Sequence, residues 1–138
     1  MTTGSRGDGE RRGIAVLFDL GNTLARYYER AEFGPILQRS VQAVLAELGR
    51  RGIRAPDFDA AMGAARQENR EAPDFRFTPM EARLSRIFRL EAPESTLLRA
   101  LCERFLGPIF AAGRVYDDTL PALERLRTAG SPTAIVSN

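Results

Sequence analysis

The sequence predicts an α/β fold, and three observations lead to that prediction. An apolar run from Ile14 to Phe18 ends in an acidic residue, Asp19. A second β-prone run, 131–136, follows a helical pattern near the other end of the chain. Between the two runs, apolar residues recur at helical spacing over most of residues 26–113. Two strands of one sheet, separated by a long helical insertion, are the arrangement that these patterns indicate.

The first strand is expected over Ile14–Phe18, because a uniformly apolar run is typical of a strand buried on both faces of a parallel sheet. Gly21, Asn22 and Thr23 follow it and favour a tight turn. In open α/β sheets, ligands bind just beyond the carboxyl ends of the strands. Asp19 therefore lies at the expected position of a functional site.

The inserted segment is expected to form four helices. They are predicted at Phe33–Leu48 with Gly49 as the stop, at Asp57–Glu71, from the Thr78 start signal to about Leu90, and from Glu94 or Ser95 onward. In the third helix, Thr78 is expected to cap, Pro79 to fit the first turn and Glu81 to complete a capping box. Pro108 is expected to kink or interrupt the fourth helix.

One more helix is predicted between the insertion and the second strand. Apolar residues at helical spacing in 120–126 indicate it, and Gly130 is its expected stop signal. The helix leads into the strand 131–136. Since strand crossovers are right-handed, the two strands are expected to lie side by side and parallel, which would bring Asp19 and Ser137 to one edge of the sheet.

These residues make the sequence resemble the haloacid dehalogenase-like (HAD) superfamily of hydrolases. The first motif of that family is an apolar strand followed by Asp-x-Asp-x-Thr, and its second is an apolar strand that ends in Ser or Thr, often followed by Asn. The matching residues here are Asp19, Thr23, Leu24, Ser137 and Asn138. The segment VYDDTLPALERLRTAGSPTAIVSN also resembles the family's run from an inserted cap into the second motif.

The resemblance implies an α/β fold with an HAD-like Rossmannoid core and an inserted α-helical bundle cap. Only the first two parallel strands and one helix of that core are expected to be present. Residues 13–25 and 114–138 would form this partial core, and residues 26–113 the cap. Residues 1–12 are polar and rich in Gly, so we expect them to be a disordered tail.

The resemblance also implies the roles of individual residues. Asp19 would be the nucleophile that forms an aspartyl-phosphate, and it would also bind Mg²⁺. Ser137, Asn138, Thr23 and Gly21 would bind the phosphate of a small phosphorylated metabolite.

Three residues of the expected cap could contact the rest of the substrate. They are Arg26 and Tyr27, just after the first motif, and Arg76, in a predicted loop. The alternative is that these side chains serve as ordinary hinge, packing or surface residues, as aromatic and Arg side chains usually do outside a pocket.

The sequence departs from the family pattern at Gly21, which stands where phosphatases of the family have a second Asp. General acid/base help is typically worth about 10² to 10⁴-fold, so its loss is expected to slow the reaction by that order. The resemblance also leaves open the family's phosphonate hydrolases, which have a small residue here and form a Schiff base with a cap lysine. The chain has no lysine, and all 20 basic residues are Arg, which disfavours that mechanism.

The third and fourth family motifs cannot be assigned before Asn138. Asp19 and the main-chain carbonyls of Leu20 and Gly21 are the only expected Mg²⁺ ligands. We expect a longer protein, or a second chain that completes the core.

Composition excludes other classes. The absence of His excludes a Ser-His or Cys-His nucleophile, and Cys102 is expected to be a buried small hydrophobe. Asp117 and Asp118 precede a predicted helix and are expected to cap it rather than to bind metal. A net charge of +2 does not favour a nucleic-acid partner, and no apolar run suits a membrane or a signal peptide, so a cytoplasmic location is expected.

Two functional classes remain open. The first is a Mg²⁺-dependent HAD-like phosphatase that is incomplete as given. The second is a non-catalytic remnant or partner-binding module, which Gly21 and the unassigned motifs favour.

Overall fold

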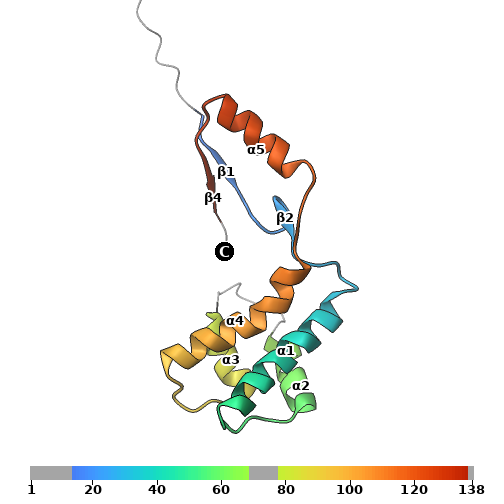
Figure 1. The fold of residues 1–138 in the computed structure, drawn as a ribbon, viewed down its shortest axis with the longest axis vertical. Helices are drawn as coiled ribbons and strands as arrows, with labels where there is room; N and C mark the ends of the chain where they lie inside the picture. Colours follow the sequence, from blue (N-terminus) through green and yellow to red (C-terminus); the bar gives the residue numbers. More distant parts are fainter. Residues whose placement is uncertain (1–13, 69–77, 137–138) are drawn as a thin grey trace, which may run out of the picture. The chain divides into compact units, whose positions relative to one another are not determined.

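The computed structural model describes residues 14–68 and 78–136, and this part of the chain is mixed α/β (Figure 1). The described helices are α1 (Phe33–Arg50), α2 (Phe58–Glu68), α3 (Met80–Phe88), α4 (Ser95–Ala112) and α5 (Thr119–Thr128), and the described strands are β1 (Val16–Phe18), β2 (Ala25–Arg26), β3 (Arg114–Val115) and β4 (Thr133–Ile135). The chain divides into two compact units, which we name the α/β unit (Met1–Arg26 with Val115–Asn138) and the helical unit (Tyr27–Arg114).

In the α/β unit, β1 and β4 are parallel neighbours. Phe18 lies opposite Ile135, and the Val136 N–H donates to the Phe18 carbonyl over 2.8 Å. The predicted parallel pairing is thereby confirmed. α5 leads into β4, and Gly130, with φ of 70°, follows the helix as its predicted stop signal. β2 and β3 form a separate two-stranded pair.

The prediction that the first strand is buried on both faces is wrong for the described structure. Leu17, at the centre of β1, is 66% exposed, and Ile14 is 74% exposed. In the β4 segment, Ile135 is 58% exposed. The reason is that this sheet has two strands and that α5 buries little more than Thr119 within the described residues. The strand therefore has the composition of a buried strand without the layers that would bury it.

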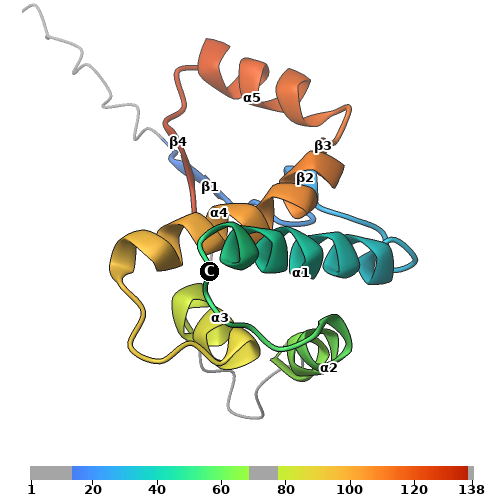
Figure 2. The same ribbon diagram turned by 60° about the horizontal axis from the view of Figure 1, so that its bottom comes forward.

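In the helical unit, α1 and α4 lie side by side and run in opposite directions, and α2 and α3 pack below them in the view of Figure 2. Apolar residues three or four apart give each helix one buried stripe. The resulting core consists of Leu37, Val41, Val44, Leu48, Ala61, Met62, Ala65, Leu84, Ile87, Phe88, Leu101 and Phe105. The predicted helices thus supply a core that belongs to this unit alone.

The predicted end of the first helix is wrong by two residues. α1 continues through Gly49 to Arg50, and Gly52, with φ of 67°, takes the left-handed conformation that ends it. The Ile53 N–H then donates to the Leu48 carbonyl over 2.9 Å, the pattern of a Schellman cap. An apolar residue frequently follows the glycine of such a cap. Ile53 follows Gly52 in this way, whereas the residue after Gly49 is Arg50.

The predicted capping box of the third helix is also wrong. α3 begins at Met80 with Pro79 as its N-cap residue, and no side chain caps it. Thr78 is therefore one residue too early to reach the first free N–H groups. By contrast, Asp57 does cap α2, because its carboxylate accepts the Ala60 N–H over 2.8 Å. The predicted end of this second helix at Glu71 lies outside the described residues.

Pro108 does not interrupt the fourth helix. α4 continues from Ser95 to Ala112, with Pro108 in its interior. Proline removes one helical hydrogen bond, but Phe105 and Ile109 on either side of it pack on or against the core. Tertiary packing therefore maintains the helix where local preference alone would end it.

Candidate functional site

Asp19 lies directly after β1, at the carboxyl end of that strand, and is exposed. The neighbouring strand ends at the same edge, since Val136 is hydrogen-bonded to Phe18, the residue before Asp19. The described structure therefore presents an accessible carboxylate at the edge where parallel strands place ligand sites. A carboxylate in this position can act as a nucleophile or bind a cation.

A tight turn follows Asp19 and is built around one carbonyl. The Leu20 carbonyl accepts the N–H groups of Thr23, Leu24 and Ala25 over 3.4, 3.1 and 3.1 Å. Asn22 has φ of 60°, a left-handed conformation that Asn tolerates better than most residues. The Leu20 carbonyl thus holds the turn together by accepting three main-chain donors.

Thr119 anchors this turn, and sequence reasoning did not identify it. Its buried hydroxyl donates to the Leu24 carbonyl over 2.8 Å, and the Tyr116 N–H donates to the same carbonyl over 3.2 Å. The first residue of α5 therefore supports the loop that follows Asp19. The only sign of this role in the sequence was a Thr at the start of a predicted helix. Its partner, Leu24, lies 95 residues away in the chain.

The predicted phosphate-binding residues can be placed only in part. Gly21 is half-buried and bridges to Ala25, and Thr23 is exposed in the turn. Both lie within four residues of Asp19 along the chain. Ser137 and Asn138 lie outside the described residues.

Of the predicted substrate contacts beyond the first motif, Arg26 and Tyr27 are half-buried, and Arg76 lies outside the described residues. The Tyr27 ring packs edge-on against Phe110, with ring centroids 6.5 Å apart. This contact gives Tyr27 a packing role within the helical unit.

Within residues 14–68 and 78–136, no group of three or more His, Cys, Asp or Glu side chains is arranged to hold a metal ion. Asp19 supplies one carboxylate, whereas Mg²⁺ prefers near-octahedral oxygen coordination.

Asp118 occupies the N-cap position of α5, so the predicted start of this helix is confirmed. Its side chain forms no capping hydrogen bond, so the predicted cap is not confirmed.

Cys102 does not have the properties of a nucleophile. It is partly buried against the core of the helical unit. Burial raises the pKa of its thiol, and the nearby carboxylates of Glu81 and Glu103 raise the pKa further. The thiol is therefore held in its unreactive protonated form.

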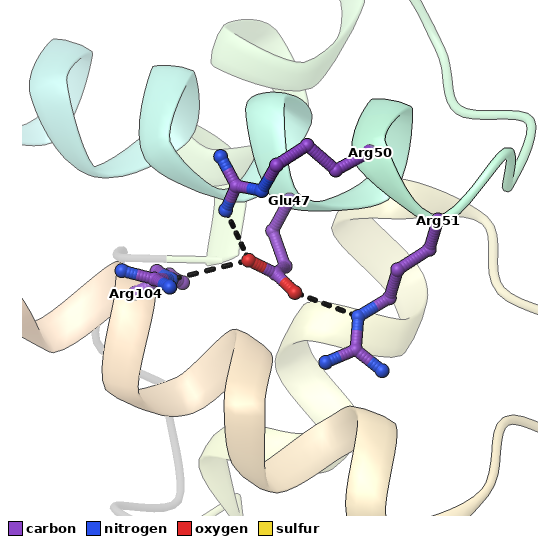
Figure 3. Close-up of polar contacts among 4 residues, drawn as sticks. All are labelled: Glu47, Arg50, Arg51 and Arg104. Atoms are coloured by element: carbon purple, nitrogen blue, oxygen red, sulfur yellow. Dashed lines mark hydrogen bonds and ion pairs between the residues drawn. The ribbon is translucent and has the colours of Figure 1, made fainter.

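A second polar cluster, which sequence reasoning did not identify, surrounds Glu47 in the helical unit (Figure 3). The buried Glu47 carboxylate accepts hydrogen bonds from Arg51 over 2.6 Å, from Arg104 over 3.2 Å, and from Arg50. We name these four residues the Glu47 cluster. Hydrogen bonds from Arg51 and Arg50 lower the pKa of Glu47 from 4.5 to about 2, against the opposing effect of burial.

The Glu47 cluster is structural rather than catalytic. A carboxylate with a pKa of about 2 stays ionised near neutral pH, so it cannot serve as a general acid there. Arg104 lies on α4, whereas Glu47 lies on α1, and their ion pair joins the two longest described helices. The spacing of Glu47 from Arg50 and Arg51 was a usable signal for two of the three contacts.

Comparisons with known proteins add no identification. A scan against protein-family models finds no matching family, and a search of curated proteins finds no match. In the part of the chain that the structure describes, no helix is both long and apolar enough to span a membrane.

Proposed function

We propose that this protein is an HAD-like phosphohydrolase that acts on a small phosphate ester through Asp19. In this proposal the α/β unit is the first part of a Rossmannoid core, and the helical unit is the inserted cap. The observation that carries the proposal is the parallel pairing of β1 and β4, which end together beside Asp19. The match of residues 14–24 to the family's first motif supports the same chemistry.

The proposed reaction begins with attack of a carboxylate oxygen of Asp19 on phosphorus. A bond forms between that oxygen and phosphorus, and the ester P–O bond breaks. The leaving alkoxide takes a proton, and water then hydrolyses the aspartyl-phosphate to release inorganic phosphate and regenerate Asp19. The turn anchored by Thr119 positions the residues that follow the nucleophile.

Gly21 makes the proposed enzyme slow. It has no side chain that could protonate the leaving group or activate water, so water itself must act. We expect this to reduce the rate by about 10² to 10⁴-fold relative to a site with a carboxylate at this position.

Magnesium is part of the proposal, with Asp19 as the described carboxylate that would bind it. The ion would offset the negative charge of the phosphate. The remaining oxygen ligands would come from the phosphate, from water and from groups other than the described residues.

The test is Mg²⁺-dependent release of phosphate from a panel of phosphate esters. Four proteins are compared: the parent, Asp19→Asn, Gly21→Asp and the control Asp117→Asn. Asp117 is an exposed carboxylate outside the proposed site. Gly21 is not among the described glycines with a positive φ, so an Asp is compatible with its backbone.

We expect Asp19→Asn to abolish phosphate release, Asp117→Asn to leave it unchanged, and Gly21→Asp to raise it by about 10² to 10⁴-fold. Acid quenching of the parent should trap phosphate on the protein, and Asp19→Asn should trap none. Equal phosphate release by the parent and Asp19→Asn would reject the assigned nucleophile.

The uncovered sheet supports a second proposal, that another polypeptide segment completes the α/β unit. Leu17, Ile135 and Val136 are 66, 58 and 59% exposed. An apolar parallel sheet of two strands is marginal in water because its edges and faces remain uncovered. A protein with this partner-binding role could be an enzyme as well, or it could bind a partner without being an enzyme.

Sedimentation velocity tests this second proposal on the full chain. Concentration-dependent association is expected for the parent. Leu17→Thr, which introduces a β-branched residue suited to a strand and removes apolar surface, is expected to weaken it. Leu120→Thr is the control, since Leu120 is 68% exposed on α5 rather than on the sheet. A parent that stays monomeric at all concentrations and yet fully folded would reject the proposal.

A further inference from the structure

The helical unit contains a cavity that the proposed function does not use. It lies where α1 and α3 end and α4 begins, and its volume is about 830 Å³. Ile53, Leu90 and Leu97 form apolar parts of its lining, and each of them also packs against the core of the unit. Sites for small molecules commonly have this size and an apolar lining.

Two arginines line the cavity. Within residues 14–68 and 78–136, neither Arg54 nor Arg89 forms an ion pair or a side-chain hydrogen bond. The lining also contains two acids, but the Asp57 carboxylate already accepts the Ala60 N–H as the cap of α2. Glu91 is the other acid in the lining. Two guanidinium groups against one uncommitted carboxylate favour an anionic occupant.

Arg89 lies in a strained conformation at the wall of this cavity. Its φ of 52° and ψ of 47° are left-handed, and it ends α3 as Gly52 ends α1. Glycine takes this conformation without penalty, whereas a side chain makes it unfavourable. Strain of this kind gathers at ligand sites, where the surrounding structure maintains it. Arg89 therefore occupies a helix end at which glycine would be more stable, and it also lines the cavity.

All residues that line the cavity belong to the helical unit. The chain enters this unit before α1 and leaves it after α4, whereas the cavity lies at the opposite ends of both helices. α1 has 18 residues, which corresponds to a length of about 27 Å. None of the residues that line the cavity belongs to the first motif, residues 14–24.

We propose that this cavity binds a small molecule that carries an oxyanion on an apolar body. The apolar body contacts Ile53, Leu90 and Leu97, and the oxyanion pairs with Arg54 and Arg89. A carboxylate and a phosphate monoester share this chemistry, and both are compatible with the two guanidinium groups.

The proposal is tested by calorimetric titration of the full chain with four probes. Octanoate and octyl phosphate carry both elements, 1-octanol lacks the charge, and octylamine reverses it. The variants are Arg54→Gln and Arg89→Gly. The control is Arg39→Gln, an exposed arginine of α1 that does not line the cavity.

We expect saturable binding of at least one of the two anions, and the tighter of the two identifies the class of oxyanion. Octanol and octylamine should bind at least about tenfold more weakly. Arg54→Gln and Arg89→Gly should each weaken anion binding by about tenfold, and Arg39→Gln should not change it. Arg89→Gly should at the same time raise the thermal unfolding midpoint, because it removes the backbone strain.

That opposite pair of effects separates a lost contact from a damaged fold. Equal binding of octanol and octanoate would overturn the proposal. So would unchanged anion affinity in both cavity variants, or no saturable anion binding at about 1 mM. None of these outcomes depends on Asp19, so the proposed phosphohydrolase activity is tested independently.

Discussion

At the scale of single residues, the Glu47 cluster links pH to stability. The pKa of Glu47 is lowered from 4.5 to about 2 in the folded protein, first by its hydrogen bond from Arg51 and then by that from Arg50. A group whose folded pKa is depressed stabilises the protein above its unfolded pKa. That contribution is lost as the pH falls from about 4.5 towards 2.

Glu47→Gln is predicted to lower the free energy of unfolding at neutral pH and to make this free energy depend less on pH in the acidic range. The difference in unfolding free energy between parent and variant should be largest above about pH 5 and shrink as the pH falls below 4.5. Chemical denaturation at a series of pH values measures this difference. Glu103→Gln, which alters an exposed carboxylate on α4, is the control. A parent-to-variant difference that does not change with pH would contradict the assignment.

The candidate site could be predicted from sequence where its residues are close in the chain. The acid after an apolar strand identified Asp19, and the spacing of Glu47 from Arg50 was also readable. Thr119 and Arg104 act on partners 95 and 57 residues away, so their roles depend on tertiary structure. No local pattern contains that information.

At the scale of helices and strands, the end of α1 shows which local signal determines a boundary. Gly49 and Gly52 are both possible stops, but only Gly52 has a positive φ and an apolar residue after it. An added Cβ at Gly49 meets no heavy atom within 4 Å. The two glycines therefore have opposite tolerances for a side chain.

Gly49→Ala is predicted to stabilise the helical unit by about 0.5–1 kcal/mol. Position 49 is helical in the folded protein, and alanine lowers the conformational entropy that the unfolded chain loses on folding. Gly52→Ala is predicted to destabilise it by about 1 kcal/mol or more, because a side chain disfavours φ of 67°. Thermal unfolding of both variants beside the parent measures the two shifts. If Gly49→Ala were the more destabilising, the observed helix end would be incorrect.

The order of the described helices and of β1 and β4 could be predicted from sequence, because the apolar spacing in residues 33–48 and 120–126 is distinctive. The two-residue strands β2 and β3 were not predicted, because two residues are too few to give a periodic pattern. Exact ends were harder to predict. Pro108 favours a helix end, yet packing of Phe105 on one side and Ile109 on the other keeps α4 continuous. Local preferences of about 1–3 kcal/mol are readily exceeded by core packing.

At the scale of the whole molecule, the two units differ in how well they bury their apolar residues. The helical unit has a core in which Val41, Val44 and Leu101 are fully buried. In the α/β unit, Leu17 and Ile135 remain mostly exposed. Since burial of apolar surface is the main favourable contribution to folding, the two units should differ strongly in local stability.

Hydrogen exchange of the full chain is predicted to show this difference residue by residue. Amides of Val44 and Leu101 should exchange at least about 100-fold more slowly than those of Val16 and Val136, which corresponds to an opening free energy about 2.7 kcal/mol higher. Val16 and Val136 are suitable reporters because their N–H groups are bonded across the sheet, to Pro132 and Phe18. Equal protection in both units would mean that two strands and α5 suffice to stabilise the sheet. Fast exchange confined to the sheet would instead mean that the α/β unit becomes stable only when another segment covers it. The backbone hydrogen bonds between β1 and β4 are already formed, so the missing contribution is the burial of the apolar faces of the sheet.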